Sequence, residues 1–303
     1  MNETRHIDGH DIELSHLDKV YFPESGITKK DVVDYFEKVA PYMLPQLKDR
    51  PLSMQRYPEG IRGEGFYQQD MPDYFPDWIA RVEVPKEAGI VTHVVCNDAA
   101  TLVYLANQGF LIPHMWLSHA DRLSYPDRLV VDLDPPDDFD KPASLQATAL
   151  RLRDRFHDLG LTAYVNTTGS TGYHIYVPLE REMEFHDVRD FAHDVVSELA
   201  ERYPDELTVE HRINKRGRRI FLDTLRNSYA HTVVAPYSIR ARDGAPVATP
   251  LSWSELESKA VGPQRYNIKN LFRHLGNRKD PWAGMDSHAG SVVRAREKMS
   301  GRK

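Results

Sequence analysis

Helical periodicity marks several segments of the chain. After Thr28, apolar residues recur every three or four positions from Val32 to Leu47, and Pro51 ends the stretch. Thr28 is a suitable N-cap because Asp31 follows it three residues later. The same kind of pattern predicts four further helices, over residues 98–109, 143–159, 186–202 and 264–275.

Short apolar runs between these helices predict strands. The clearest cover residues 128–133, 161–166 and 173–178, and shorter ones cover 208–210, 219–222 and 232–235. Helices and strands are mixed but do not alternate strictly. The pattern therefore favours an α+β fold with a largely antiparallel central sheet and helices packed on it. The residues from about Met285 onward are mostly small, polar or basic, and we expect residues 285–303 to form a flexible basic tail.

Composition limits the class of protein. The chain has 303 residues, of which 41% are hydrophobic, so a disordered or fibrous protein is excluded. Its one cysteine, Cys96, cannot form an internal disulfide or a cysteine-rich zinc site, and we expect it to be buried. No run approaches about 18 apolar residues, and residues 1–13 are polar, so we expect no membrane association and a cytoplasmic location.

Two aspartates end an apolar run in Val-Val-Asp-Leu-Asp-Pro-Pro. Alternate side chains of a strand share a face, so Asp132 and Asp134 would lie roughly 6–7 Å apart on one side. Like charges at that spacing repel unless a cation lies between them, and carboxylate oxygens suit Mg²⁺ or Mn²⁺. The alternative is a strand end with two solvated acids.

A second apolar run, residues 219–222, also ends in an aspartate, Asp223. Three carboxylates on adjacent strand ends can hold two metal ions about 3.5–4 Å apart, an arrangement used for in-line phosphoryl transfer. The sequence is therefore compatible with a two-metal site at one rim of the sheet.

A glycine-containing turn, Thr167–His174, joins two predicted strands. Its glycines allow successive backbone N–H groups to converge on an anion, while Ser170 adds a hydroxyl and His174 a ring donor. It is not a Walker A loop, because the Gly-Lys-Ser/Thr ending is absent. An ordinary hairpin followed by a buried histidine is the alternative.

The net charge of −6 is unusual for a nucleic-acid-binding protein, but basic residues are concentrated locally. Residues 212–219 form a basic run that we expect to be mostly a solvated face. Arg226 and Arg240 each flank a strand that would lead to the same rim as the aspartates.

Aromatic residues alternate with polar ones around Phe66 and Tyr67. Such residues stack on unpaired bases when they are exposed, and packing in the core is the alternative. We expect Tyr74, Phe75 and Trp78, which follow shortly after, to belong to the core.

These segments together carry a family resemblance. They are HLDKVYFPESGITKKD, RYPEG, GFYQQD, PDWI, the His114-x-Trp116 pair, DLDPP, TTGSTGYHIYVPL, FLDTLRN and APYSIRAR. In this order, from about Leu14 to Pro250, they resemble the polymerase domain of bacterial ligase D, the nonhomologous end-joining member of the archaeo-eukaryotic primase superfamily.

The resemblance implies a fold and an activity. The fold is a primase-like two-layer α+β core, here as one domain over residues 1–284 that includes an N-terminal helical, DNA-end-binding part over about 1–60. The activity is template-directed addition of ribonucleotides, or less readily deoxyribonucleotides, to DNA 3′ ends at gaps and breaks by two-metal nucleotidyl transfer. The metal is Mn²⁺, or Mg²⁺, two ions per site. The protein would be a nucleoid-associated monomer with Ku and an ATP-dependent DNA ligase as partners.

The resemblance also implies roles for single residues. Asp132, Asp134 and Asp223 correspond to the catalytic metal ligands. The nucleotide-binding set is Ser170, Thr171, Gly172, His174, His114, Arg226, Thr232 and Arg240. The DNA-binding set is Lys19, Lys29, Arg56, Phe66 and Tyr67, with the two lysines on the 5′-phosphate of a gap. Thr171 stands where family members often carry a lysine, and Gln55 stands where some members carry a basic residue, which lowers the expected nucleotide affinity.

Two other functions remain open at this point. Carboxylates at strand ends also serve two-metal nucleases and phosphodiesterases. A non-catalytic DNA-end-binding module would use the lysines and aromatic residues without needing three aspartates.

Overall fold

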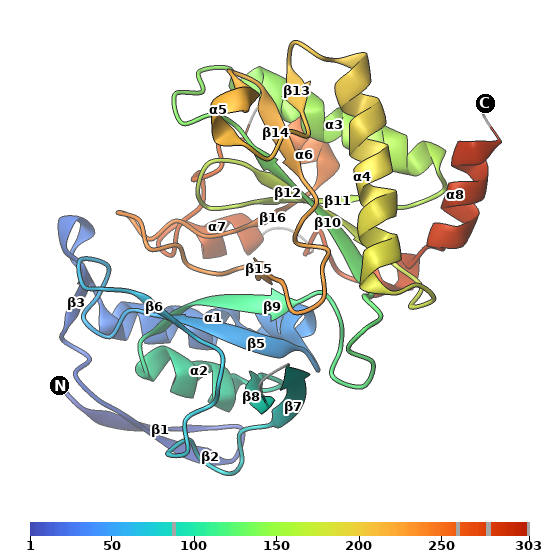
Figure 1. Cartoon of the computed structure of the whole chain (residues 1–303). Helices are drawn as coiled ribbons and strands as arrows, with labels where there is room; N and C mark the ends of the chain where they lie inside the picture. Colours follow the sequence, from blue (N-terminus) through green and yellow to red (C-terminus); the bar gives the residue numbers. More distant parts are fainter. Residues whose placement is uncertain (87–88, 259–260, 277–279, 302–303) are drawn as a thin grey trace. The chain divides into compact units, whose positions relative to one another are not determined.

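The computed structural model describes residues 1–86, 89–258, 261–276 and 280–301, and the chain folds as two compact units. Unit 1 comprises residues 1–121, 232–248 and 266–276, and unit 2 comprises residues 122–231, 249–265 and 277–303. Figure 1 shows the helices and strands of each unit. None of the helices in the described residues is long and apolar enough to cross a membrane.

Unit 1 is built on a sheet with strand order β15-β9-β5-β8-β7, and β6 pairs with β5. Two small two-stranded sheets, β1-β2 and β3-β4, accompany it. Its elements are β1 (Glu3–Ile7), β2 (His10–Leu14), β3 (Val20–Phe22), the 3-10 helix η1 (Pro23–Ser25), β4 (Ile27–Thr28), α1 (Lys29–Leu47), β5 (Pro51–Arg56), β6 (Phe66–Gln68), β7 (Arg81–Lys86), β8 (Gly89–Val95), α2 (Ala99–Asn107), β9 (Phe110–Trp116), β15 (Thr232–Val234) and α7 (Leu271–Leu275).

Unit 2 contains a six-stranded sheet with the order β13-β14-β10-β12-β11-β16. All of its pairings are antiparallel except β13 with β14. Its elements are β10 (Arg128–Asp134), α3 (Pro142–Asp158), β11 (Tyr164–Thr167), β12 (Tyr173–Pro178), α4 (Phe185–Arg202), β13 (Leu207–Thr208), α5 (Ile213–Arg216), β14 (Ile220–Asp223), β16 (Pro250–Leu251), α6 (Trp253–Ser258), the 3-10 helix η2 (Met285–His288) and α8 (Val292–Ser300).

Helix α1 begins where the sequence predicts. The Thr28 hydroxyl accepts from the Asp31 amide while the Asp31 carboxylate accepts from the Thr28 amide, a complete capping box. The apolar stripe, including Val32, Phe36 and Val39, is fully buried. Helix α1 packs against α2, which Asp98 caps through the amide of Thr101. Local chain chemistry and burial therefore agree in this part of unit 1.

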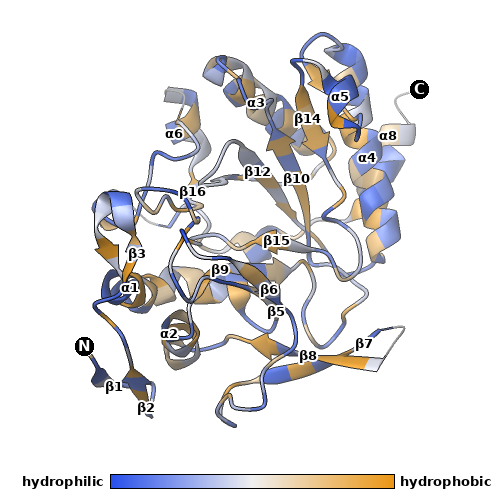
Figure 2. Cartoon of the chain, turned by 60° about the vertical axis from the view of Figure 1, so that its left-hand side comes forward, coloured by the Kyte–Doolittle hydropathy of each residue, from blue (hydrophilic) through white to orange (hydrophobic). Residues whose placement is uncertain are grey.

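Helices α3 and α4 contact each other and cover the sheet of unit 2, α3 on β12 and α4 on β10 and β13. Both helices carry hydrophobic and hydrophilic positions in alternation, whereas the central strands are mostly hydrophobic (Figure 2). In β10, Val131 and Leu133 are fully buried. Because side chains alternate, Asp132 and Asp134 lie on the opposite face of that strand.

Three expectations about the fold need correction. The expected mixture of helices and largely antiparallel strands is confirmed, but each unit has its own sheet instead of one central sheet, and most strands of unit 1 were not predicted. Of the helix expected over 264–275, only α7 (Leu271–Leu275) forms. The described part of the expected tail is ordered, because α8 packs on α4 and buries Val292 and Ala295. Residues 302–303 lie outside the described residues, and the domain extent of 1–284 stays a prediction.

Candidate active site

Three polar side chains form a row across adjacent strands of unit 2. Asp132 on β10 is the register partner of His174 on β12 and of Asp223 on β14. Asp134 follows Asp132 by two residues and therefore shares its face. The sheet thus brings the three predicted carboxylates together on one face, as the sequence pattern indicated.

The electrostatics of this row favour a bound cation. Burial raises the pKa of Asp134 to about 7, and the neighbouring charges of Asp132 and Asp223 add to the effect, while His174 and Arg216 oppose it. His174 is 3% exposed, and its Nε2 atom lies 3.4 Å from Oδ2 of Asp132. Asp134 resists ionisation because it is buried beside two like charges. A positive charge placed among the three carboxylates would stabilise its ionised form.

The donor set fits a hard divalent metal ion by its chemistry, because carboxylate oxygens are the ligands that Mg²⁺ and Mn²⁺ prefer. Among the described residues, however, no three His, Cys, Asp or Glu side chains are arranged to hold a metal ion as they stand. The aspartates are thus candidate ligands.

A buried asparagine fixes the loop that follows Asp223. The Asn227 side chain accepts from the Val130 amide at 2.8 Å and donates to the Val130 carbonyl at 2.6 Å, and it is fully buried. Asp223 itself accepts from the Leu225 amide at 2.8 Å. Asn227 therefore ties this loop to β10. Sequence reasoning passed over it, although its place in the FLDTLRN segment was a usable signal.

The glycine turn differs from the expectation that its backbone amides converge on an anion. The Thr168 hydroxyl accepts from the amides of Ser170 and Gly172, at 3.1 Å each. The Thr168 amide donates in turn to the Gly172 carbonyl at 3.0 Å. Two of the amides are thus used inside the turn. The hydroxyls of half-buried Ser170 and exposed Thr171 are further groups that this turn can offer to an anion.

Gly172 allows the turn to lie close against β10. A Cβ atom at this position would sit 1.8 Å from the Leu133 carbonyl oxygen, so no other residue fits without moving β10. Gln264 braces the other side by donating to the Ser170 carbonyl at 2.8 Å. Arg226, also in unit 2, is exposed in the loop after β14.

The remaining nucleotide-binding candidates belong to unit 1. Val234 of β15 is the register partner of His114 on β9, and Thr232 pairs with Trp116, so His114 and Thr232 share one face of neighbouring strands. The His114 ring lies 5.2 Å from the Tyr67 ring, and its Nε2 atom is 3.4 Å from Oε1 of Gln55. Gln55 thus borders His114.

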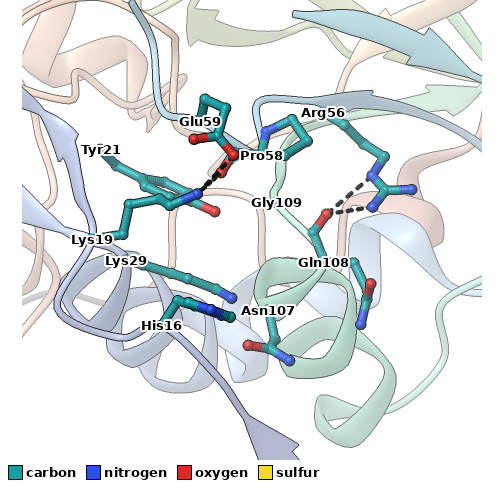
Figure 3. A pocket seen from close by; sticks show the side chains of 10 residues that line it. All are labelled: His16, Lys19, Tyr21, Lys29, Arg56, Pro58, Glu59, Asn107, Gln108 and Gly109. Carbon is teal, nitrogen blue, oxygen red and sulfur yellow. Dashed lines mark hydrogen bonds and ion pairs between the residues drawn. The ribbon is translucent and has the colours of Figure 1, made fainter. Parts of the chain in front are cut away.

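Both predicted phosphate lysines line one pocket of unit 1, with a volume of about 340 Å³ (Figure 3). Lys29 is 5% exposed and donates to the Ser15 carbonyl at 2.7 Å. Burial, followed by the charge of Lys19, lowers the pKa of Lys29 to about 8. Lys19 donates to the Glu59 carboxylate at 2.8 Å and to the Pro58 carbonyl at 3.1 Å.

Arg56 also borders this pocket and is held from several sides. Its Nε and Nη2 atoms donate to the Gln108 carbonyl at 3.0 and 2.7 Å (Figure 3). Its Nη1 atom donates to the Gln68 side chain at 2.6 Å. Phe66 and Tyr67 on β6 are 44% and 60% exposed, so the core alternative for them is wrong.

The site residues divide between the units. Those in unit 2 are Asp132, Asp134, Asp223, Ser170, Thr171, Gly172, His174 and Arg226, and those in unit 1 are His114, Thr232, Arg240, Lys19, Lys29, Arg56, Phe66 and Tyr67. The row of Asp132, Asp134 and Asp223 (the carboxylate row) lies within unit 2, and the pocket lined by Lys19 and Lys29 (the lysine pocket) lies within unit 1.

The chain resembles known end-joining proteins. It is 32% identical over 274 residues to the bifunctional non-homologous end joining protein LigD of Bacillus subtilis, an alignment covering 89% of this chain and 43% of that protein. The multifunctional non-homologous end joining protein LigD of Pseudomonas aeruginosa is 32% identical over 96% of this chain and 35% of its own length. The chain therefore spans less than half of these relatives.

A solved structure and a family model agree with these relatives. The polymerase domain from Mycobacterium tuberculosis ligase D, in complex with DNA, matches with a TM-score of 0.85 and 29% identity over 91% of this chain and 98% of the solved one. The model of the LigD primase-polymerase domain matches residues 28–282. The family model covers residues 28–282, and the relatives and the solved structure agree with it. The chain therefore belongs to the LigD primase-polymerase domain family.

Proposed function

We propose that this domain extends DNA 3′ ends at gaps and breaks by template-directed nucleotidyl transfer, with ribonucleotides preferred over deoxyribonucleotides. The observation that carries the proposal is the register that sets Asp132 beside Asp223 and His174, with Asp134 on the same face. Membership of the LigD primase-polymerase family supports a nucleotidyltransferase rather than a hydrolase.

Each set of residues has a part in this proposal. His174, the hydroxyls of Ser170 and Thr171, and Arg226 bind the triphosphate and offset the charge that grows on it during transfer. Asp132, Asp134 and Asp223 would hold two Mn²⁺ or Mg²⁺ ions, which when bound neutralise phosphate charge and activate the primer 3′-hydroxyl.

The residues of unit 1 serve the nucleic acid and the nucleotide. The pocket of Lys19 and Lys29 binds the 5′-phosphate on the far side of a gap, since two ammonium groups in a partly desolvated pocket suit a dianion. His114 contacts the sugar region of the incoming nucleotide, Thr232 on the same face meets the nucleotide with its hydroxyl, and Arg240 contacts the triphosphate. Phe66 and Tyr67 stack on unpaired template bases.

The names of the relatives support a place in end joining, so we further propose that the domain works with Ku and an ATP-dependent DNA ligase. These partners would supply end bridging and sealing, two steps for which the proposed site offers no chemistry.

A primer-extension assay tests the proposed function. A gapped, 5′-phosphorylated DNA with a labelled primer is incubated with one NTP or dNTP and Mn²⁺ or Mg²⁺. A longer product is expected, formed more readily from the NTP. Asp132→Ala and Asp223→Ala should abolish extension while DNA affinity stays near that of the wild type. A shortened primer would identify a nuclease, and extension by either variant would overturn the assignment.

A further inference from the structure

Tyr74 lies on the surface of unit 1, although its sequence context suggests the core. Its side chain is 62% exposed, whereas the next residue, Phe75, is 3% exposed. The segment around it is anchored, because the Phe75 ring contacts Tyr104 at 5.2 Å and the Trp78 ring stacks on His10 at 4.2 Å. The exposed ring of Tyr74 is therefore a feature of a well-packed segment.

The hydroxyl of Tyr74 contacts a fixed arginine. Arg56 Nη1 donates to it at 3.3 Å, and the Arg56 guanidinium lies 5.6 Å from the centre of the Phe66 ring. The three side chains are contiguous, and we refer to Tyr74, Arg56 and Phe66 as the aromatic platform. Phe66 is also 44% exposed, so the platform presents two rings and a planar cation at the surface.

The aromatic platform adjoins the lysine pocket, because Arg56 and Gln108 line that pocket and the Gln108 carbonyl holds the Arg56 side chain. Cationic groups that suit a phosphate are thus continuous with exposed rings that suit a base. Single-stranded nucleic acid presents this pair of groups at each nucleotide, and stacking on aromatic side chains is its common mode of binding. A protein partner would not need the adjoining lysine pocket.

We propose that Tyr74 is a further DNA-binding residue, which stacks on an unpaired template base beside the 5′-phosphate of a gap. This inference rests on the proposed function, which supplies the template strand. It adds a ring to the predicted template contacts, Phe66 and Tyr67.

Two variants separate stacking from support of Arg56. Tyr74→Leu removes the ring, whereas Tyr74→Phe keeps the ring and removes only the acceptor for Arg56. Tyr203→Leu is the control. Tyr203 in unit 2 also contacts an arginine, because the Arg151 guanidinium carbon lies 3.7 Å from the centre of its ring, and it lies outside the aromatic platform. Thermal melting of each variant checks that the chain remains folded.

Affinity is measured by fluorescence anisotropy, without metal or nucleotide, on 5′-phosphorylated gapped DNA. The gap holds either normal or abasic template nucleotides, so that only the bases differ. Tyr74→Leu should bind the normal gap about 5- to 100-fold more weakly, in line with the stacking of one base. On the abasic gap it should equal the wild type. Tyr74→Phe and Tyr203→Leu should bind both substrates as the wild type does.

Two outcomes overturn the inference. One is a Tyr74→Leu protein with wild-type affinity for the normal gap. The other is an equal loss in Tyr74→Leu and Tyr74→Phe, which would limit Tyr74 to positioning Arg56. A failure of the proposed function is a separate result. Even if the wild-type protein does not extend primers, the Tyr74→Leu variant can still show, or fail to show, a loss of DNA affinity that depends on the template bases.

Discussion

Asp132 on β10 lies directly opposite Asp223 on β14 in an antiparallel register. The backbone spacing of such a pair places the two side chains on one face, within a few ångströms of each other. Like charges in directly opposite positions destabilise a sheet. The pairing therefore costs stability in this part of unit 2 and is consistent with the proposed binding of a positively charged ligand there.

The raised pKa of Asp134 predicts a pH-dependent stability of the metal-free protein. In the unfolded chain this carboxyl ionises near its ordinary value of 3.8, but in the folded chain its pKa is about 7. The folded state thus holds the proton more tightly, so stability falls as the pH rises from about 4 to about 7. Asp134→Asn should raise Tm at pH 8 in EDTA by roughly 2–5 °C and have little effect near pH 4.

The control for this prediction is Asp137→Asn, which changes an exposed acid in the following loop. Its Tm should follow that of the wild type across the pH range. A gain in Tm for Asp134→Asn that is the same at pH 4 and pH 8 would contradict an electrostatic origin.

Lys29 predicts a pH dependence of 5′-phosphate recognition. Its pKa of about 8 means that it loses its charge as the pH rises from 7 to 9, before a phosphate is bound. The ratio of affinities for phosphorylated and unphosphorylated gaps should therefore fall several-fold over this range. Lys29→Arg keeps the charge and should give a flat ratio. A flat ratio in the wild type would show that Lys29 does not contribute.

We expect removal of the Glu59 charge to raise the affinity for a phosphorylated gap. Its carboxylate holds Lys19 at 2.8 Å in the pocket and competes with an incoming phosphate. Glu59→Gln should tighten binding of the phosphorylated gap by about two- to tenfold, because an exposed ion pair is worth roughly 0.2–1 kcal/mol and the carboxylate also repels the dianion. Glu64→Gln, at a nearby exposed position, should change nothing. Weaker binding in Glu59→Gln would instead mean that Glu59 orients Lys19 for the phosphate.

We expect removal of the Thr168 hydroxyl to weaken nucleotide binding specifically. Its hydroxyl accepts from two amides of the glycine turn, and leaving buried amides unsatisfied costs about 1–3 kcal/mol. Thr168→Val should raise KM for the nucleotide by about tenfold, with a smaller change in kcat, as measured by steady-state extension. Thr168→Ser retains the hydroxyl and should restore KM. If Thr168→Val left KM unchanged, the turn would not depend on this hydroxyl.

Several features could be predicted from the sequence because they depend on neighbours along the chain. The start of α1 follows from Thr28 and Asp31, whose side chains cap the helix within one turn. The shared face of Asp132 and Asp134 follows from strand alternation. The segments that carry these residues also indicated the family, which the LigD primase-polymerase match confirms.

Other features depend on which distant segments pack together, and no local pattern encodes that choice. The exposure of Tyr74 beside the buried Phe75 depends on rings from other parts of unit 1, such as Tyr104. The use of the Ser170 and Gly172 amides by Thr168 depends on how the turn closes against β10.

By itself, the sequence determined the helices of regular period, the alternation of β10 and the set of carboxylates, since each depends on the order of residues within one element. The tertiary structure alone decided that Asp223 stands opposite Asp132, that Asn227 locks their loop, and that Lys19 and Lys29 share a pocket with Arg56. The physical reason is that strand register and side-chain burial are properties of the whole packed unit, and long-range contacts set them.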